Sequence, residues 1–440
     1  MRADKTAAGT DPVPAAVCAQ AAALLHGNGE STQATISAME HLQTVAHNPQ
    51  AAAHNKPQTA QEPEGTATAH FPMREDWSGI TVFAPQDQGG TQYVPASPTE
   101  HHLGRVNAGL RAIGEFRGDF GALSHELQAA SQLKAYPAWV FALACGLGSM
   151  SLALIFGEQH PASVALIGAA AALGGVVRRA MAGHFDQFLQ IFTAAFIGGA
   201  AGALAVHLGI SDSARLVALC PAMVLVPGPH ILNGCLDLAH RRADLGTARL
   251  VNAGLIVLAI SAGVLVGLAA GGVSLPVEGV THPAMGYTDV LAAGLVAVAY
   301  SVFFTLPVKF MPWAAGVSML AHGLHWYLLT VLGWSLAAAG LVHCLVVGIV
   351  LSPVCKRHRI PFVGPGFAAV VALVPGMYMF RAAAGVVVLA GGNADAQLLL
   401  QLATDASTAV VVTLALATGL LIPHLLWSMI LRNRVRRRTS

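Results

Sequence analysis

The chain has 440 residues, of which 55% are hydrophobic and 10% are charged, whereas soluble proteins average about 25% charged residues. A formal net charge of +2 excludes the massed basic surface that nucleic-acid binding requires. The six cysteines form no C-x-x-C pair, so we interpret them as small core residues and expect neither a disulfide framework nor a metal site. The composition predicts a membrane protein with no nucleic-acid partner.

Residues 1–136 differ from the rest and predict a small cytoplasmic N-terminal domain with a linker. Residues 1–16 lack the basic start and apolar stretch of a secretory signal, so we expect the N-terminus to stay in the cytoplasm. Residues 17–47 carry apolar side chains at helical spacing around a Gly-Asn-Gly turn, and residues 48–68 have the composition of a linker. Residues 80–83 favour a strand. We expect either a small mixed domain or a set of cytoplasmic helices.

From Pro137 onward, apolar windows of membrane-spanning length follow one another, since a hydrocarbon core of about 30 Å needs about 20 helical residues. Ten windows are predicted to cross the bilayer: 137–156, 161–177, 188–208, 216–236, 250–271, 290–306, 313–331, 334–352, 360–380 and 407–430. The expected fold is an all-α polytopic membrane protein with about ten transmembrane helices. Five helices lie in residues 137–272, five lie in residues 288–431, and residues 432–440 form a basic cytoplasmic tail.

The positions of lysine and arginine predict the orientation, because cytoplasmic loops retain these residues. If the N-terminus is placed in the cytoplasm, fourteen lysines and arginines fall on the cytoplasmic side: Arg178, Arg179, Arg241, Arg242, Arg249, Lys309, Lys356, Arg357, Arg359, Arg432, Arg434, Arg436, Arg437 and Arg438. Two, Arg215 and Arg381, fall on the outer side. Both termini are therefore expected in the cytoplasm.

The tetrad "LVPG" occurs twice, at Leu225–Gly228 and at Leu373–Gly376, each time inside an apolar window. Proline removes a backbone donor and glycine permits dihedral angles that other residues avoid, so both windows are predicted to be broken helices. Each break falls in the fourth helix of a set of five, and because five is odd, the second set must be inverted relative to the first. Transporters with inverted repeats bind substrate near the midplane at such breaks. A packing kink without a ligand is the alternative.

Several segments resemble the threonine/serine exporter family. The stretch "LVPGPHILNGCLDLAHRRADLGTARLVNA" is similar to that family's fourth and fifth helices, and residues 105–157 are similar to the approach to its first helix. Residues 17–42 resemble its N-terminal helix pair, and "ALVPGMYMFRA" resembles the second Pro-Gly element. The resemblance covers about residues 17–431.

The resemblance implies a secondary active exporter of small hydroxy amino acids, threonine and serine, across the bacterial inner membrane. Coupling to an ion gradient agrees with the sequence, which contains no G-x-x-x-x-G-K-[ST] loop to hold ATP phosphates. A related branch of the family is associated with dicarboxylates, so export of small dicarboxylates such as succinate is an alternative, and a passive channel is another.

The expected partners are a small-molecule substrate (an amino acid or a small carboxylate), a proton or other coupling ion, and the lipid bilayer. A homo-oligomer remains open, and no cofactor is expected. The sequence contains no H-E-x-x-H motif, no G-x-S-x-G motif and no paired intramembrane aspartates, so we do not predict an enzyme.

Side chains around the two breaks form the predicted substrate site: Pro227, Gly228, His230, Asn233, Pro375, Gly376, Tyr378 and Arg381. A zwitterionic amino acid could place its carboxylate at a half-helix N-terminus or on Arg381, and its ammonium on freed carbonyls or an acid. The alternative for Arg381 is an arginine that extends to the membrane interface. His230 adjoins the first break and suits proton transfer.

Asp237 is the predicted coupling residue, because it lies about 13 Å along a helix from Gly228, at 1.5 Å per residue, near the cytoplasmic mouth. The alternative is a loop carboxylate that pairs with Arg241 or Arg242.

Other polar residues in the apolar half were assigned simpler roles. Asp186, Asp289 and Asp405 sit at predicted helix ends, where solvated caps are typical. His322 and His325 share a helix face, but no third ligand with metal spacing is visible, so no metal site is predicted there.

Overall fold

The N-terminal part of the chain combines helices with a small sheet in the computed structural model, which describes residues 13–47, 71–86, 89–210, 214–274, 286–392 and 396–439. Its helices are α1 (Pro14–Gly27), α2 (Thr32–His47), α3 (Leu103–Glu115) and α4 (Phe120–Ser131). Strands β1 (Met73–Glu75), β2 (Gly79–Val82) and β3 (Gln92–Pro95) form an antiparallel sheet in the order β1-β2-β3. The predicted linker, residues 48–68, lies outside the described residues.

We call α1 to α4 with this sheet the N-terminal unit. Apolar residues from its helices and sheet form one buried cluster, in which Val17, Leu25, Ile80 and Val106 are almost completely buried. Strand β2 begins one residue before the predicted strand at 80–83 and supplies the centre of the sheet. The label all-α is therefore wrong for this part of the chain, because alternating apolar residues pair into a sheet that covers α1.

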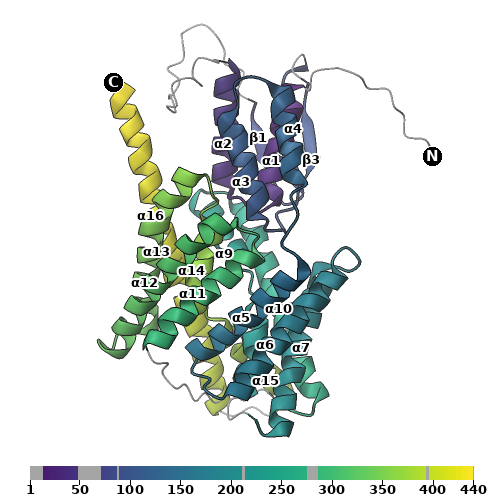
Figure 1. The fold of residues 1–440 in the computed structure, drawn as a ribbon, viewed down its shortest axis with the longest axis vertical. Helices are drawn as coiled ribbons and strands as arrows, with labels where there is room; N and C mark the ends of the chain where they lie inside the picture. The colour runs from purple at the N-terminus through teal and green to yellow at the C-terminus, as the bar shows by residue number, and fades with distance from the viewer. Residues whose placement is uncertain are drawn as a thin grey trace, which may run out of the picture.

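The remaining elements are almost entirely helical: α5 (Ala138–Ile155), α6 (Pro161–Met181), α7 (Gln187–Leu208), α8 (Ala214–Met223), α9 (Gly228–Ala239), α10 (Ala243–Ala270), α11 (Gly286–Phe303), η3 (Val308–Phe310), α12 (Met311–Thr330), α13 (Leu336–His358), α14 (Val363–Val370), η4 (Val371–Leu373), α15 (Gly376–Ala390) and α16 (Ala396–Thr439). They form an elongated bundle, with the N-terminal unit at one end (Figure 1). We call this end the near side and the opposite end the far side.

Among the described residues, seven helices are long and apolar enough to cross a membrane, and the number rises to nine if each of two bent pairs is one span. A multi-pass membrane protein is thus confirmed, whereas the predicted number of ten is not. The predicted window 313–331 corresponds to α12, which is 20 residues long but is not among those spans. Its two histidines and its Trp326 and Tyr327 lower its hydropathy.

Both predicted helix breaks are present. The pair α8 and α9 bends by 57° at Val224–Pro227, and the pair formed by α14 with η4 and α15 bends by 63° at Val374–Pro375. Pro227 and Pro375 cap the second helix of each pair at its N-terminus. Proline fits there because the first turn of a helix has unpaired N–H groups in any case.

The N-terminal unit is held to the bundle by backbone contacts at helix ends. The amides of Leu103 and Gly104 donate to the carbonyls of Phe304 and Thr305, which follow α11, at 2.9 and 3.0 Å. Asn107 Nδ2 donates to the carbonyl of Arg359 after α13, at 2.8 Å. These bonds satisfy carbonyls that a helix leaves unpaired at its C-terminus, so the docking position is specific.

Candidate functional site

The two helix breaks lie against each other in the middle of the bundle. The ring of Phe367, on α14, covers Gly228 so closely that a Cβ atom on that glycine would overlap it. In the reverse direction, a Cβ atom on Gly376 would lie 3.6 Å from Val226 Cγ2 and 3.7 Å from Met223 Cε. Each break therefore contacts residues of the other broken pair.

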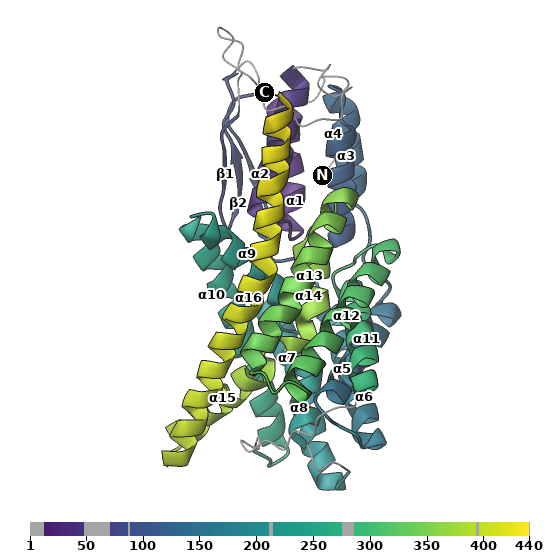
Figure 2. The ribbon, with the colours of Figure 1, turned by 90° about the vertical axis from the view of Figure 1, so that its left-hand side faces the viewer.

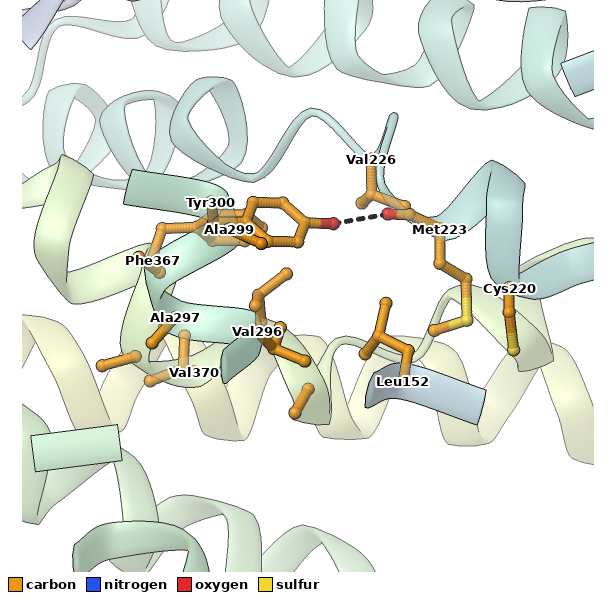
Figure 3. Close-up of a cluster of buried hydrophobic side chains, with 14 of the residues drawn as sticks. Leu152, Cys220, Met223, Val226, Val296, Ala297, Ala299, Tyr300, Phe367 and Val370 are labelled. Atoms are coloured by element: carbon orange, nitrogen blue, oxygen red, sulfur yellow. Dashed lines mark hydrogen bonds between the residues drawn. The ribbon is translucent and has the colours of Figure 1, made fainter. Parts of the chain in front are cut away.

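A tyrosine from a third helix completes this contact (Figure 3). The carbonyl of Met223 cannot accept its usual helical bond, because the residue four positions later is Pro227, which has no N–H. That carbonyl accepts a long bond from the Val226 amide at 3.3 Å and a shorter one from the Tyr300 hydroxyl on α11 at 2.7 Å. Tyr300 is almost fully buried. The freed backbone group is thus paired inside the protein, which a bilayer interior requires.

Apolar side chains fill the space around the two breaks. Leu152, Val296 and Val370 are almost completely buried and belong to the same cluster as Tyr300 and Phe367 (Figure 3). Because protein cores pack at crystal-like density, the described residues leave no continuous polar path between the two breaks. Within the described part of the chain, the bundle is therefore closed at the breaks.

On the near side of the breaks, an ion pair joins α9 to α10. Asp237 Oδ2 lies 3.0 Å from Nε of Arg249, and Asp237 Oδ1 lies 3.8 Å from Nη1 of Arg242. Arg249 has no exposed surface, although its position just before the predicted window 250–271 indicates a cytoplasmic loop. That assignment is wrong, because α10 begins at Ala243 and carries Arg249 into the bundle. Arg242 is one of the two partners that the loop-carboxylate alternative named for Asp237.

The N-terminal unit covers this ion pair. The carbonyl of Gly29 accepts from Asn233 Nδ2 at 3.2 Å, and the ring of His101 contacts the ring of His230, with centroids 4.7 Å apart. Arg242 Nη2 donates to Gln33 Oε1 at 2.8 Å. Two predicted site residues, His230 and Asn233, are therefore buried under residues of the N-terminal unit.

Several polar atoms in this region have no hydrogen-bond partner among the described residues. They are Nη1 and Nη2 of Arg249, Nδ2 of Asn252, Oδ1 of Asn233 and Nδ1 of His230. All four residues are buried and belong to α9 or α10. A buried polar group without a partner costs about 1–3 kcal/mol, so such a concentration of them makes this region a candidate polar binding site. Arg249 and Asn252 were missed because nothing in the sequence separates them from helix-end residues.

The N-terminal unit adds two carboxylates to the same region. Burial raises the pKa of Glu30 from 4.5 to about 7, although the Ser31 amide donates to this carboxylate at 2.7 Å and Arg249 attracts it. Burial likewise raises the pKa of Glu75, whose Oε2 lies 3.4 Å from His26 Nδ1. Both carboxyl groups interact electrostatically with Arg249.

On the far side of the breaks, a second ion pair joins α15 to α16. Arg381 Nε lies 3.0 Å from Asp405 Oδ2, and the Arg381 guanidinium lies 6.0 Å from the ring centroid of Tyr378. Arg215 is close enough to Arg381 and Asp405 to interact with both. Arg381 is thus paired with an acid on the neighbouring helix.

The predicted helix caps divide into one correct case and two wrong ones. Asp186 caps α7, because its carboxylate accepts from the Phe188 amide at 2.8 Å. Both Asp405 and Asp289 are instead buried against a basic side chain. Asp405 is ion-paired with Arg381, and Asp289 Oδ2 lies 3.2 Å from Nε2 of His322. Their partners lie far along the chain, so position at a helix end gave the wrong assignment.

Comparison with protein families decides the identity. A model named ThrE, for threonine/serine exporters, matches residues 100–271, and a model described as "Threonine/Serine exporter, ThrE" matches residues 289–426. The chain belongs to the threonine/serine exporter family. In this exporter the first match contains the break at Gly228 and the second contains the break at Gly376. Neither a search of curated proteins nor a search of solved structures found a match.

The contact between the breaks predicts that their two glycines respond differently to alanine. Gly228→Ala should lower the melting temperature and the membrane abundance of the exporter, because the added methyl group overlaps Phe367 and overpacking costs about 1–3 kcal/mol. Gly376→Ala should fold normally, because its methyl group meets only ordinary contacts. Adding Phe367→Leu to Gly228→Ala should restore folding. Equal melting temperatures in detergent for the two single variants would contradict the observed contact.

The raised pKa of Glu30 predicts that docking of the N-terminal unit depends on pH. Since the docked carboxyl holds a proton that an exposed carboxyl loses above about pH 4.5, docking weakens as pH rises from about 4.5 through about 7 and is weakest above that. Hydrogen exchange of residues 27–33, corrected for intrinsic rates, should be slower at pH 6 than at pH 8. Glu30→Gln should remove most of this difference in exchange rate between pH 6 and pH 8. An unchanged rate difference in that variant would show that another group causes the pH dependence.

Proposed function

We propose that this protein is a secondary active exporter that moves threonine and serine out across the bacterial inner membrane and is driven by an ion gradient. Family membership supports the substrate class. The observation that carries the mechanism is that two broken helices meet between two buried polar clusters, one on each side of a closed centre. That arrangement suits a binding site that opens to one side at a time.

The proposed topology has ten spans, with α12 as one of them and both termini in the cytoplasm. Helix α12 packs against α11 and α13, which are both long enough to span. The N-terminal unit and the C-terminal end of α16 lie at the same end of the bundle (Figure 2). Without Arg249, thirteen lysines and arginines are predicted on the cytoplasmic side and two on the outer side, and together with these observations they support a cytoplasmic near side.

Equivalent helix contacts support two repeats. The pairs α5 with α6, α7 with α10 and α9 with α10 correspond to the pairs α11 with α12, α13 with α16 and α15 with α16. Helices α5 and α11, the first of each set, also contact each other. An odd number of spans in the first set then inverts the second, as proposed from the two tetrads.

The ion pairs occupy corresponding places in this scheme. Asp237 on α9 pairs with Arg249 on α10, and Arg381 on α15 pairs with Asp405 on α16, so the acid and the base are exchanged between the repeats. We infer that the first pair helps to close the cytoplasmic side and the second the outer side. Pro227 with Gly228 and Pro375 with Gly376 act as the hinges between half-helices.

The near-side cluster fits a zwitterion. The free N–H groups of Arg249 and Asn252 suit an α-carboxylate, while Asn233 Oδ1 and the Asp237 carboxylate suit an α-ammonium. His230 Nδ1 can bond the side-chain hydroxyl of serine or threonine. A dicarboxylate fits less well, because Asp237 already pairs with Arg249 and the carboxyl groups of Glu30 and Glu75 also interact with this arginine.

Counterflow in liposomes tests this function, with a panel of labelled threonine, serine, alanine and succinate. We expect threonine and serine to exchange fastest. Uphill movement of serine that requires an imposed gradient would exclude a passive channel. Exchange of succinate alone would replace the proposed substrate with a dicarboxylate.

The proposed carboxylate contact gives a sharper prediction. Asn252→Ala should raise the serine concentration for half-maximal export by about tenfold or more, because a hydrogen bond to a charged group contributes about 1.5–3 kcal/mol. Ser261→Ala on the same helix is the matched control, since the Ser261 hydroxyl donates to the Val257 carbonyl within α10. Both variants should reach the membrane in normal amounts. An unchanged half-saturation concentration in Asn252→Ala would remove this residue from the site.

A further inference from the structure

Three histidines gather inside the bundle, away from the near-side and far-side ion pairs. His322 and His325 lie one turn apart on α12, and His343 lies on α13. Their ring centroids are 5.5 Å apart for His322 and His325, 5.7 Å for His322 and His343, and 6.0 Å for His325 and His343. All three side chains are buried. The sequence placed the first two on one face, and the fold adds the third.

A carboxylate from a third helix completes the group. Asp289 Oδ2, in the first turn of α11, lies 3.2 Å from Nε2 of His322. Helix α14 also packs against these helices and contributes no titratable side chain, only the carbonyl of Ala369. Cys344, beside His343 on α13, packs against Gly419 on α16. We call Asp289, His322, His325 and His343 the histidine cluster.

Each ring of the histidine cluster keeps one nitrogen without a hydrogen-bond partner in the described part of the chain: Nδ1 of His322, Nε2 of His325 and Nδ1 of His343. Ionisable groups inside a membrane are costly and mark ion or proton pathways. A metal does not fit, because the described residues contain no group of three or more His, Cys, Asp or Glu side chains arranged to hold one. Neighbouring imidazoles that can accept and pass on a proton are suited to a proton site.

The histidine cluster also touches the second broken helix. His343 Nε2 lies 3.2 Å from the carbonyl of Ala369, on the half-helix that precedes Pro375. When Nε2 carries a proton, it donates to this carbonyl; when the proton is on Nδ1 alone, the Nε2 lone pair faces the carbonyl and repels it. The proton positions in the cluster therefore bias the position of α14, which carries Phe367 against Gly228.

We propose that the histidine cluster is the site at which protons couple to export by this protein. The inference rests on the proposed function and names the residues that carry its coupling. One proton arrives at the Asp289–His322 pair, whose charge changes from −1 to 0 as a neutral imidazole becomes an imidazolium beside the carboxylate. Asp289 lies at the start of α11, whereas the end of α11 contacts the N-terminal unit. The proton therefore enters from the far side, as antiport against an exported amino acid requires.

Reconstituted protein can separate coupling from substrate exchange. In liposomes, His322→Gln and His343→Gln should lose serine accumulation driven by a pH gradient and keep serine counterflow, which needs no gradient. His207→Gln is the matched control, because His207 lies at the exposed end of α7 and outside the cluster. It should keep both activities. Proton movement with serine, followed by a pH-sensitive dye, should disappear in the cluster variants and remain in the control.

Three outcomes would decide against one proposal or the other. Gradient-driven accumulation that persists in both cluster variants overturns the histidine cluster as the coupling site. Parent protein that accumulates serine with a sodium gradient but not with a pH gradient overturns the proton and leaves the exporter function intact. Absence of threonine and serine counterflow in well-folded parent protein overturns the exporter function itself. Should a histidine variant fail to insert, Asp289→Asn, which keeps the shape and removes the charge, provides the same test.

Discussion

Inside a bilayer every backbone N–H and C=O group needs a partner within the protein, and this constraint organises the structure around its two broken helices. Proline prevents normal helical bonding at both breaks, so each break must be buried against other protein. The fold places the two breaks against each other and uses Tyr300 to pair the Met223 carbonyl. The two breaks, where each helix lacks normal hydrogen bonds, thus form a closed contact at the centre of the bundle.

This central contact separates the polar groups into two sets. The Asp237–Arg249 pair lies on the side of the N-terminal unit, and the Arg381–Asp405 pair lies on the other side. A buried ion pair adds little net stability relative to apolar packing, because both charges lose their hydration, so these pairs are better explained as contacts that break and reform. The N-terminal unit also takes part in this contact, since Gly29, Glu30 and His101 cover the near-side pair.

Local sequence patterns predicted those features of the fold that depend only on residues close together in the chain. Hydropathy located the long helices, and the two "LVPG" tetrads located the breaks, because proline and glycine act on the backbone where they stand. Partners across the chain were not predictable in this way. Asp405 was assigned as a helix cap because its pairing with Arg381 depends on how α15 and α16 pack, and Arg249 was assigned to a loop because the start of α10 has no distinctive signal. Hydropathy alone also leaves α12 in question, since its buried histidines look polar in sequence.

The central claim is that the polar clusters on the two sides of the breaks open alternately. Cysteine accessibility measures this most directly, with Asn252→Cys on the near side and Tyr378→Cys on the far side, in a background where Cys235 is replaced by serine. An impermeant thiol reagent would be applied from each side of sealed vesicles while serine and the ion gradient are varied. The account predicts reciprocal labelling, in which conditions that expose one cysteine protect the other. Simultaneous labelling of both cysteines in one molecule from opposite sides would contradict it and indicate an open channel.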